Sequence, residues 1–123
     1  MTITNNYMIN TSIAGCFLTA AGVWTDASSR SNKTAIKPVN MKRIPELIRS
    51  LPLREYKRID PSDGGFTRYG VIAEEAPDYL ADANHQGIAA SYMAGFGLAG
   101  VKYLLEKIDQ LEKQVAKLQP RNN

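Results

Sequence analysis

The clearest hydrophobic pattern lies in the last quarter of the chain, where apolar residues recur at alternating steps of three and four. This is a heptad repeat, with β-branched residues at position a and leucines at position d. A narrow apolar seam of this kind is normally buried against copies of itself or in a groove of the same protein. We therefore predict an oligomerisation helix over residues 93–119, followed by a frayed tail over 120–123. The seam consists of Val101, Leu104, Ile108, Leu111, Val115 and Leu118.

We expect Ser91 to cap this helix. Its first turns are interrupted by three glycines, Gly95, Gly97 and Gly100. Each glycine costs roughly 1 kcal/mol relative to alanine inside a helix, so the cluster needs a reason. One reason is the close approach of a neighbouring helix. The other is a bend between a globular part and the coiled coil.

Shorter patterns over residues 38–92 predict a small globular part. Asn40 is a favourable N-cap, Pro45 fits the first turn, and apolar residues at helical spacing continue until Pro52 ends the helix. The sequence Asp60–Gly65 is a strong turn signal between two strand-like runs. We therefore expect an antiparallel hairpin formed by residues 53–59 and 66–73.

The end of the globular part predicts a short helix over residues 74–83, a loop over 82–87 and a small strand over 88–90. The first residues of the chain, 1–24, are rich in β-branched and aromatic residues broken by Asn, Ser and Gly. They indicate a β-arm of short strands that must pack on something else. A polar hinge over residues 25–37 joins this arm to the globular part, and the resulting fold class is α+β.

Composition narrows the function classes. The net charge of +3 is mild, and the basic residues form no dense run interleaved with aromatics, so nucleic-acid binding is not expected. Cys16 is the single cysteine, which excludes disulfides within the chain and thiolate metal sites. The apolar run over residues 13–23 is too short to cross a bilayer, so no membrane association is expected. We predict no metal and no cofactor.

Few side chains suggest catalysis. His85 is the single histidine and lies in a loop, where it is typically solvated or hydrogen-bonded. Glu74 and Glu75 follow a strand and point to opposite faces, which suits acid–base chemistry poorly. Ser28 and Lys33 in the hinge are the one candidate pair, because a desolvated lysine amine can act as general base for a serine hydroxyl.

The order of these features resembles the C-terminal intramolecular chaperone domain of phage tail spikes and fibres, the endosialidase-type chaperone classed as the peptidase S74 family. The resemblance covers about residues 24–119. Glu74 stands where the family usually has Gln. The segments that resemble the family are Lys33-Thr-Ala-Ile36, Leu51-Pro-Leu-Arg-Glu-Tyr56, Arg68-Tyr-Gly-Val-Ile-Ala-Glu-Glu75 with Pro77 after it, and Ser91-Tyr92 before the heptads.

The resemblance implies a homotrimer that assembles an intertwined β-rich fibre preceding it. Many members then cut themselves at a Ser-Asp bond, using that serine and a lysine five residues later. Ser28 falls on the family serine and Lys33 on the lysine, so the implied cut lies between Ser28 and Ser29. Ser29 stands where the family has Asp, and Ser31 where it often has Arg.

We therefore predict a trimeric assembly domain of a phage or phage-like tail fibre, retained uncut in the virion tail after assembly in the host cytoplasm. Its partners would be two further copies of itself and the preceding fibre or other tail proteins. A self-cleaving chaperone and a coiled-coil adaptor for a protein partner are the alternatives. Val or Ile at a with Leu at d favours two strands in isolated coiled coils, whereas the family implies three. A DNA-binding dimer ranks last.

Overall fold

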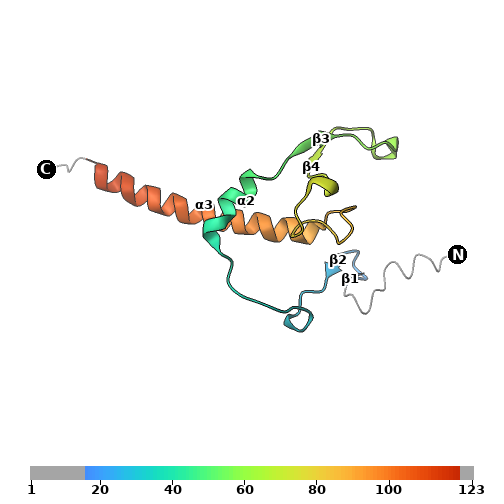
Figure 1. Ribbon diagram of the computed structural model, residues 1–123, viewed down its shortest axis with the longest axis horizontal. Coiled ribbons are helices and arrows are strands. Elements are labelled where there is room, and N and C mark those ends of the chain that lie inside the picture. The colour runs from blue at the N-terminus through green and yellow to red at the C-terminus, as the bar shows by residue number, and fades with distance from the viewer. Residues whose placement is uncertain (1–15, 120–123) are drawn as a thin grey trace. The chain divides into compact units, whose positions relative to one another are not determined.

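The computed structural model describes residues 16–119, which form an α+β fold with a small antiparallel hairpin, short helices and a long C-terminal helix (Figure 1). The chain divides into two compact units, Met1–Pro38 and Val39–Asn123. Residues 1–15 of the predicted β-arm and the tail over 120–123 lie outside the described residues.

The first unit contains a short hairpin of strands β1 (Cys16–Leu18) and β2 (Trp24–Asp26). The strands pair antiparallel, with Phe17 opposite Thr25. Thr19 makes two hydrogen bonds to Val23 across the connection between the strands. Its N–H donates to the carbonyl of Val23 at 2.8 Å, and its hydroxyl accepts the N–H of Val23 at 3.0 Å. The hinge that follows contains a single turn of 3-10 helix, η1 (Arg30–Asn32).

The second unit begins with a 3-10 turn, η2 (Met41–Arg43), that runs into helix α2 (Ile44–Arg49). Asn40 caps this segment as predicted, since its side-chain oxygen accepts the N–H of Lys42 at 3.3 Å. Pro45 lies in the first turn of α2, where its missing N–H leaves no bond unmade. The sequence therefore predicted the position of this helix and its capping residue, but the capped turn is 3-10 and the α-helix itself begins only at Ile44.

The predicted hairpin is present but shorter than expected. Strand β3 (Arg54–Tyr56) pairs antiparallel with β4 (Arg68–Gly70), and Glu55 lies opposite Tyr69. The connection contains the 3-10 turn η3 (Pro61–Asp63), capped by Asp60, which accepts the N–H of Ser62 at 2.9 Å. Gly64 follows with a φ of +96°, and any side chain there would collide with the ring of Phe66.

The prediction of a short helix over residues 74–83 is wrong. The segment forms a 3-10 turn, η4 (Ala73–Glu75), and then a series of turns. Ala76 precedes Pro77 and is extended, with φ −82° and ψ 147°, because a proline disfavours the helical conformation of the residue before it. The small strand expected over residues 88–90 is reduced to one bridge between Ile88 and Ala81.

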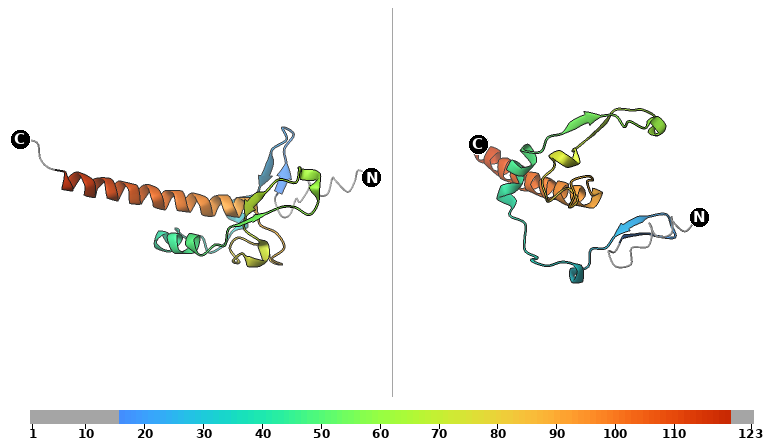
Figure 2. Two further views of the ribbon diagram at one scale, coloured as in Figure 1. Left: turned by 90° about the horizontal axis from the view of Figure 1, so that it is seen from above. Right: turned by 45° about the vertical axis from the view of Figure 1, so that its right-hand side comes forward.

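Helix α3 (Ala90–Leu118) is continuous through all three glycines (Figure 1). It starts before Ser91, and its N-cap is Ala89, which makes no side-chain capping bond. Helix α2 lies beside α3 (Figure 2), and a side chain on Gly100 would come within 2.7 Å of Ile48 Cδ1. Close approach of a neighbouring helix therefore accounts for Gly100.

The core of the second unit is small. Leu80 is fully buried at 0% exposure, and partly buried side chains such as Val71, Met93 and Phe96 pack around it. The ring of Tyr79 lies 5.2 Å from that of Phe96, between centroids, and joins the turns before α3 to the helix. A two-stranded hairpin and one such cluster supply little buried apolar area, so association with other chains is a reasonable source of stability.

Candidate functional site

Ser28 and Lys33, the pair singled out in the hinge, are in direct contact. The Lys33 Nζ atom donates a hydrogen bond to the Ser28 Oγ atom at 2.6 Å. Turn η1 lies between them and brings the two residues together, and it ends where the N–H of Lys33 donates to the carbonyl of Arg30 at 3.1 Å. The local backbone therefore supplies the geometry of a Ser–Lys pair.

Ser29 and Ser31, the two departures from the family pattern, form a small network beside this pair. The Ser29 Oγ atom caps η1 by accepting the N–H of Ser31 at 3.2 Å, and it lies 2.9 Å from the Ser31 Oγ atom. Serine and aspartate are both favoured N-caps. Ser29 therefore performs a capping role for which an aspartate would be equally suited.

The environment of the pair differs from that of an activated dyad. Both Ser28 and Lys33 are exposed in the described part of the chain. A lysine amine becomes a general base where burial removes the water around it. The hinge thus has the serine–lysine contact that such a dyad requires, and the single chain leaves that contact open to water.

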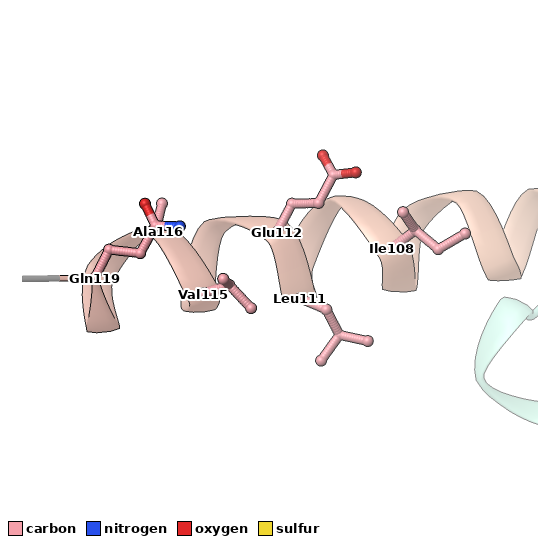
Figure 3. A pocket seen from close by; sticks show the side chains of 6 residues that line it. All are labelled: Ile108, Leu111, Glu112, Val115, Ala116 and Gln119. Carbon is pink, nitrogen blue, oxygen red and sulfur yellow. The ribbon is translucent and has the colours of Figure 1, made fainter.

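The seam residues of α3 are all on one face of the helix and all exposed, with exposed fractions between 49% at Ile108 and 83% at Leu118. The residues that line the groove on this face are shown in Figure 3, where Leu111 and Val115 project from the same side of the helix. No other described segment covers them. Contiguous exposed apolar side chains are typical of interaction sites, whether for a protein chain or for another apolar surface.

A second cluster holds the loop that leads into α3, and sequence patterns did not reveal it. The His85 Nε2 atom lies 2.8 Å from Asp78 Oδ1, and its Nδ1 atom lies 3.2 Å from the carbonyl oxygen of Ala73. Both partners only accept hydrogen bonds, so the protonated imidazole alone can satisfy them together. The bond to Asp78, then that to Ala73, raises the pKa of His85.

The same loop is closed by Asp82. Its Oδ1 atom accepts the N–H groups of Gln86 at 2.8 Å and Gly87 at 3.2 Å. These backbone hydrogen bonds favour the charged carboxylate and lower the pKa of Asp82. The loop is therefore held by the carboxylate of Asp82 and the protonated imidazole of His85. Together they stabilise it best at a pH between the pKa of Asp82 and the pKa of His85.

We expect the loop to loosen as the pH rises through the pKa of His85. A raised pKa means that the stabilising contribution is fully present below the ordinary value of about 6.5 and is lost as the pH rises through the higher folded-state value. Because His85 is the single histidine, its imidazole NMR signals report this titration directly.

Replacing Asp78 by alanine should lower the pKa of His85 towards its ordinary value, because the largest cause of the shift is removed. Asp109→Ala is the matched control, since Asp109 is an exposed carboxylate on α3. An unchanged titration in the Asp78→Ala protein would contradict this account of the loop.

Glu75, part of the acidic pair noted in the sequence, forms an ion pair with a residue of the hairpin. The Arg54 guanidinium donates from Nη2 to Glu75 Oε2 at 2.7 Å and from Nε to the same carboxylate. The hydrogen bond to Glu75, more than its charge, raises the pKa of Arg54. This bidentate pair links β3 to η4 at the surface, where both side chains stay partly exposed, so Glu75 has a structural contact in place of a chemical one.

Neither a scan of models of protein families nor searches of curated proteins and of solved structures finds a match to this chain. Among residues 16–119, no helix combines the length and the apolar character needed to span a membrane. Within the same residues, no three His, Cys, Asp or Glu side chains lie together in a way that could hold a metal ion.

Proposed function

We propose that this chain is the trimerisation and assembly domain of a phage or phage-like tail fibre or spike, an intramolecular chaperone of the peptidase S74 type. Three copies would associate through α3 and hold the β-structure that precedes each domain in register while it folds. The domain would be assembled in the host cytoplasm and remain in the virion tail. The observation that carries the proposal is the continuous α3 with its uncovered heptad seam.

The balance of buried and exposed apolar surface supports association. Leu80 is the one large side chain with no exposure among the described residues, whereas all six seam residues are exposed. A single chain would therefore leave more large apolar side chains in water than it buries. Packing three seams together removes these residues from water and adds the stability that the small core does not supply.

Sedimentation combined with intact mass tests the proposal. We expect the full chain to sediment as three copies and to retain its full mass of 13.6 kDa after prolonged incubation. Sedimentation as a monomer at micromolar concentration would remove the proposal. Two copies instead of three would support the coiled-coil adaptor, whose seam composition favours a pair of helices.

The self-cleaving alternative is favoured by one specific observation, the 2.6 Å contact between Lys33 Nζ and Ser28 Oγ. In that mechanism the neutral Lys33 amine takes the proton of Ser28 Oγ, which attacks the carbonyl carbon of the peptide bond to be cut in the hinge. The C–N bond then breaks, the leaving amine takes the proton back from Lys33, and water hydrolyses the ester that remains. Trimerisation would have to bury the pair to activate it. Appearance of a fragment ending near Ser28, abolished in Ser28→Ala and Lys33→Ala but retained in Ser31→Ala, would establish this alternative over the retained domain.

A further inference from the structure

We propose that the interface between copies extends beyond the heptad seam into the first turns of α3, where Ala94 and Gly97 form its innermost layers. The occupant of this face is the same helix from two further copies, running parallel. This inference rests on the proposed trimer and deepens it. It adds a second stretch of interface, at the end of the helix that joins the globular part.

The heptad register continues without a break towards the N-terminus of α3. One heptad before Val101 lies Ala94 at position a, and one heptad before Leu104 lies Gly97 at position d. Both residues are exposed, and no described atom lies within 4 Å of the position that a side chain on Gly97 would occupy. The same face of the helix is therefore free along its whole length.

The globular part already occupies the side of these turns next to position d. Met93 and Phe96 pack on the cluster around Leu80, and Gly100 lies against Ile48 of α2. In heptad terms Phe96 lies at position c, away from the seam, whereas Met93 and Gly100 lie at position g, which adjoins position d. The globular part therefore covers the g side of the helix and leaves positions a, d and e of these turns open. Helix α3 thus has one face for its own domain and another that is left for other chains.

Charge pattern selects a parallel partner in register. Lys107 lies at position g and Glu112 at the following position e, the two positions that meet between neighbouring chains of a parallel coiled coil. Both are exposed in the single chain. An antiparallel neighbour does not bring these two positions together, so the pairing favours copies aligned with their Ala94 and Gly97 layers side by side.

Two exposed leucines widen the apolar stripe of α3 beyond positions a and d. A wider stripe favours contact with two neighbouring copies over contact with one. Leu98 and Leu105 both fall at position e and are 61% and 57% exposed. In a two-helix pair the e positions flank the seam and stay partly in water. With three helices each chain contacts two neighbours, which covers this wider stripe of a, d and e residues. The small side chains at Ala94 and Gly97 let the three backbones come close together.

Disulfide cross-linking tests the extended interface on the full chain. In a Cys16→Ser background, which removes the single native cysteine, a cysteine is introduced by Gly97→Cys and separately by Ala94→Cys. Mild oxidation with copper phenanthroline should join two chains at either position. Because three cysteines on one axis form one bond and leave one thiol, about two chains in three should be cross-linked in a trimer.

Gly95→Cys is the matched control, because Gly95 is also an exposed helical glycine with no described atom within 4 Å of an added side chain, but lies at position b. We expect it to cross-link at least about ten-fold more slowly than Gly97→Cys. Equal rates at the two positions would overturn the inference, and complete cross-linking into pairs would overturn the three-chain form.

Leu111→Cys in the seam separates failure of this inference from failure of the proposed function. Cross-linking at position 111 without cross-linking at positions 94 and 97 leaves the trimer standing and rejects the extension. Absence of cross-linking at all three positions, together with sedimentation as a monomer, rejects both.

Discussion

Ile108→Asp should convert the proposed trimer to monomers. Ile108 lies at position a in the middle of the seam, so the substitution places a carboxylate from each chain at the axis of the assembly. An uncompensated buried charge costs about 3–5 kcal/mol, which weakens association by roughly a hundred-fold to several thousand-fold. Sedimentation across a range of concentrations measures the loss as a shift of the monomer–oligomer midpoint.

The same variant should lose helical circular dichroism in its last turns, because an isolated helix end in water is marginally stable without packing. Gln110→Asp is the control: it introduces the same side chain two residues away, at position c of the same exposed helix. It should leave the sedimentation unchanged. An Ile108→Asp protein that sediments like the parent would show that the seam is not the interface.

The sequence predicted α3 well because its signal is long and regular. A heptad sustained over Val101–Leu118 matches no strand period, and the helix is found there. The start of the helix was harder to place. Ser91 is a good capping residue by type, but the helix begins at Ala90 and its N-cap is Ala89, two residues before the predicted cap. Met93 and Phe96, in the first turns of the helix, pack on the core.

The segment over residues 73–88 was predicted poorly because its structure depends on contacts between residues distant in sequence. Glu75 pairs with Arg54, 21 residues away, and His85 reaches the carbonyl of Ala73, 12 residues away. No hydrophobic periodicity and no short sequence motif signals either contact. The local sequence suggested a helix, and Pro77 with these contacts produces turns instead.

The candidate pair in the hinge shows the reverse situation. Ser28 and Lys33 are close in sequence, so a single turn was enough to join them, and their spacing alone made the contact possible. Whether the pair is buried depends on surfaces that neighbouring copies would supply. The contact was therefore accessible to sequence reasoning, whereas the environment that decides its chemistry was not.

Leu80→Ala should destabilise the globular part by about 3 kcal/mol, because it removes the central side chain of a small core. Leu80 has no exposed surface, and its neighbours Ala76 and Ala81 are too small to fill the cavity that the substitution leaves. For a domain whose total stability is about 5–15 kcal/mol, this loss is a large fraction. Thermal unfolding followed by circular dichroism at a fixed protein concentration measures it.

The matched control is Leu53→Ala, the same substitution at a side chain that is 73% exposed beside the hairpin. It should change the unfolding free energy by no more than about 0.5 kcal/mol. Because the seam is separate from the cluster around Leu80, the Leu80→Ala protein should still associate through α3 at low temperature. Loss of association together with loss of the core would instead show that the globular part, and not the seam, holds the copies together.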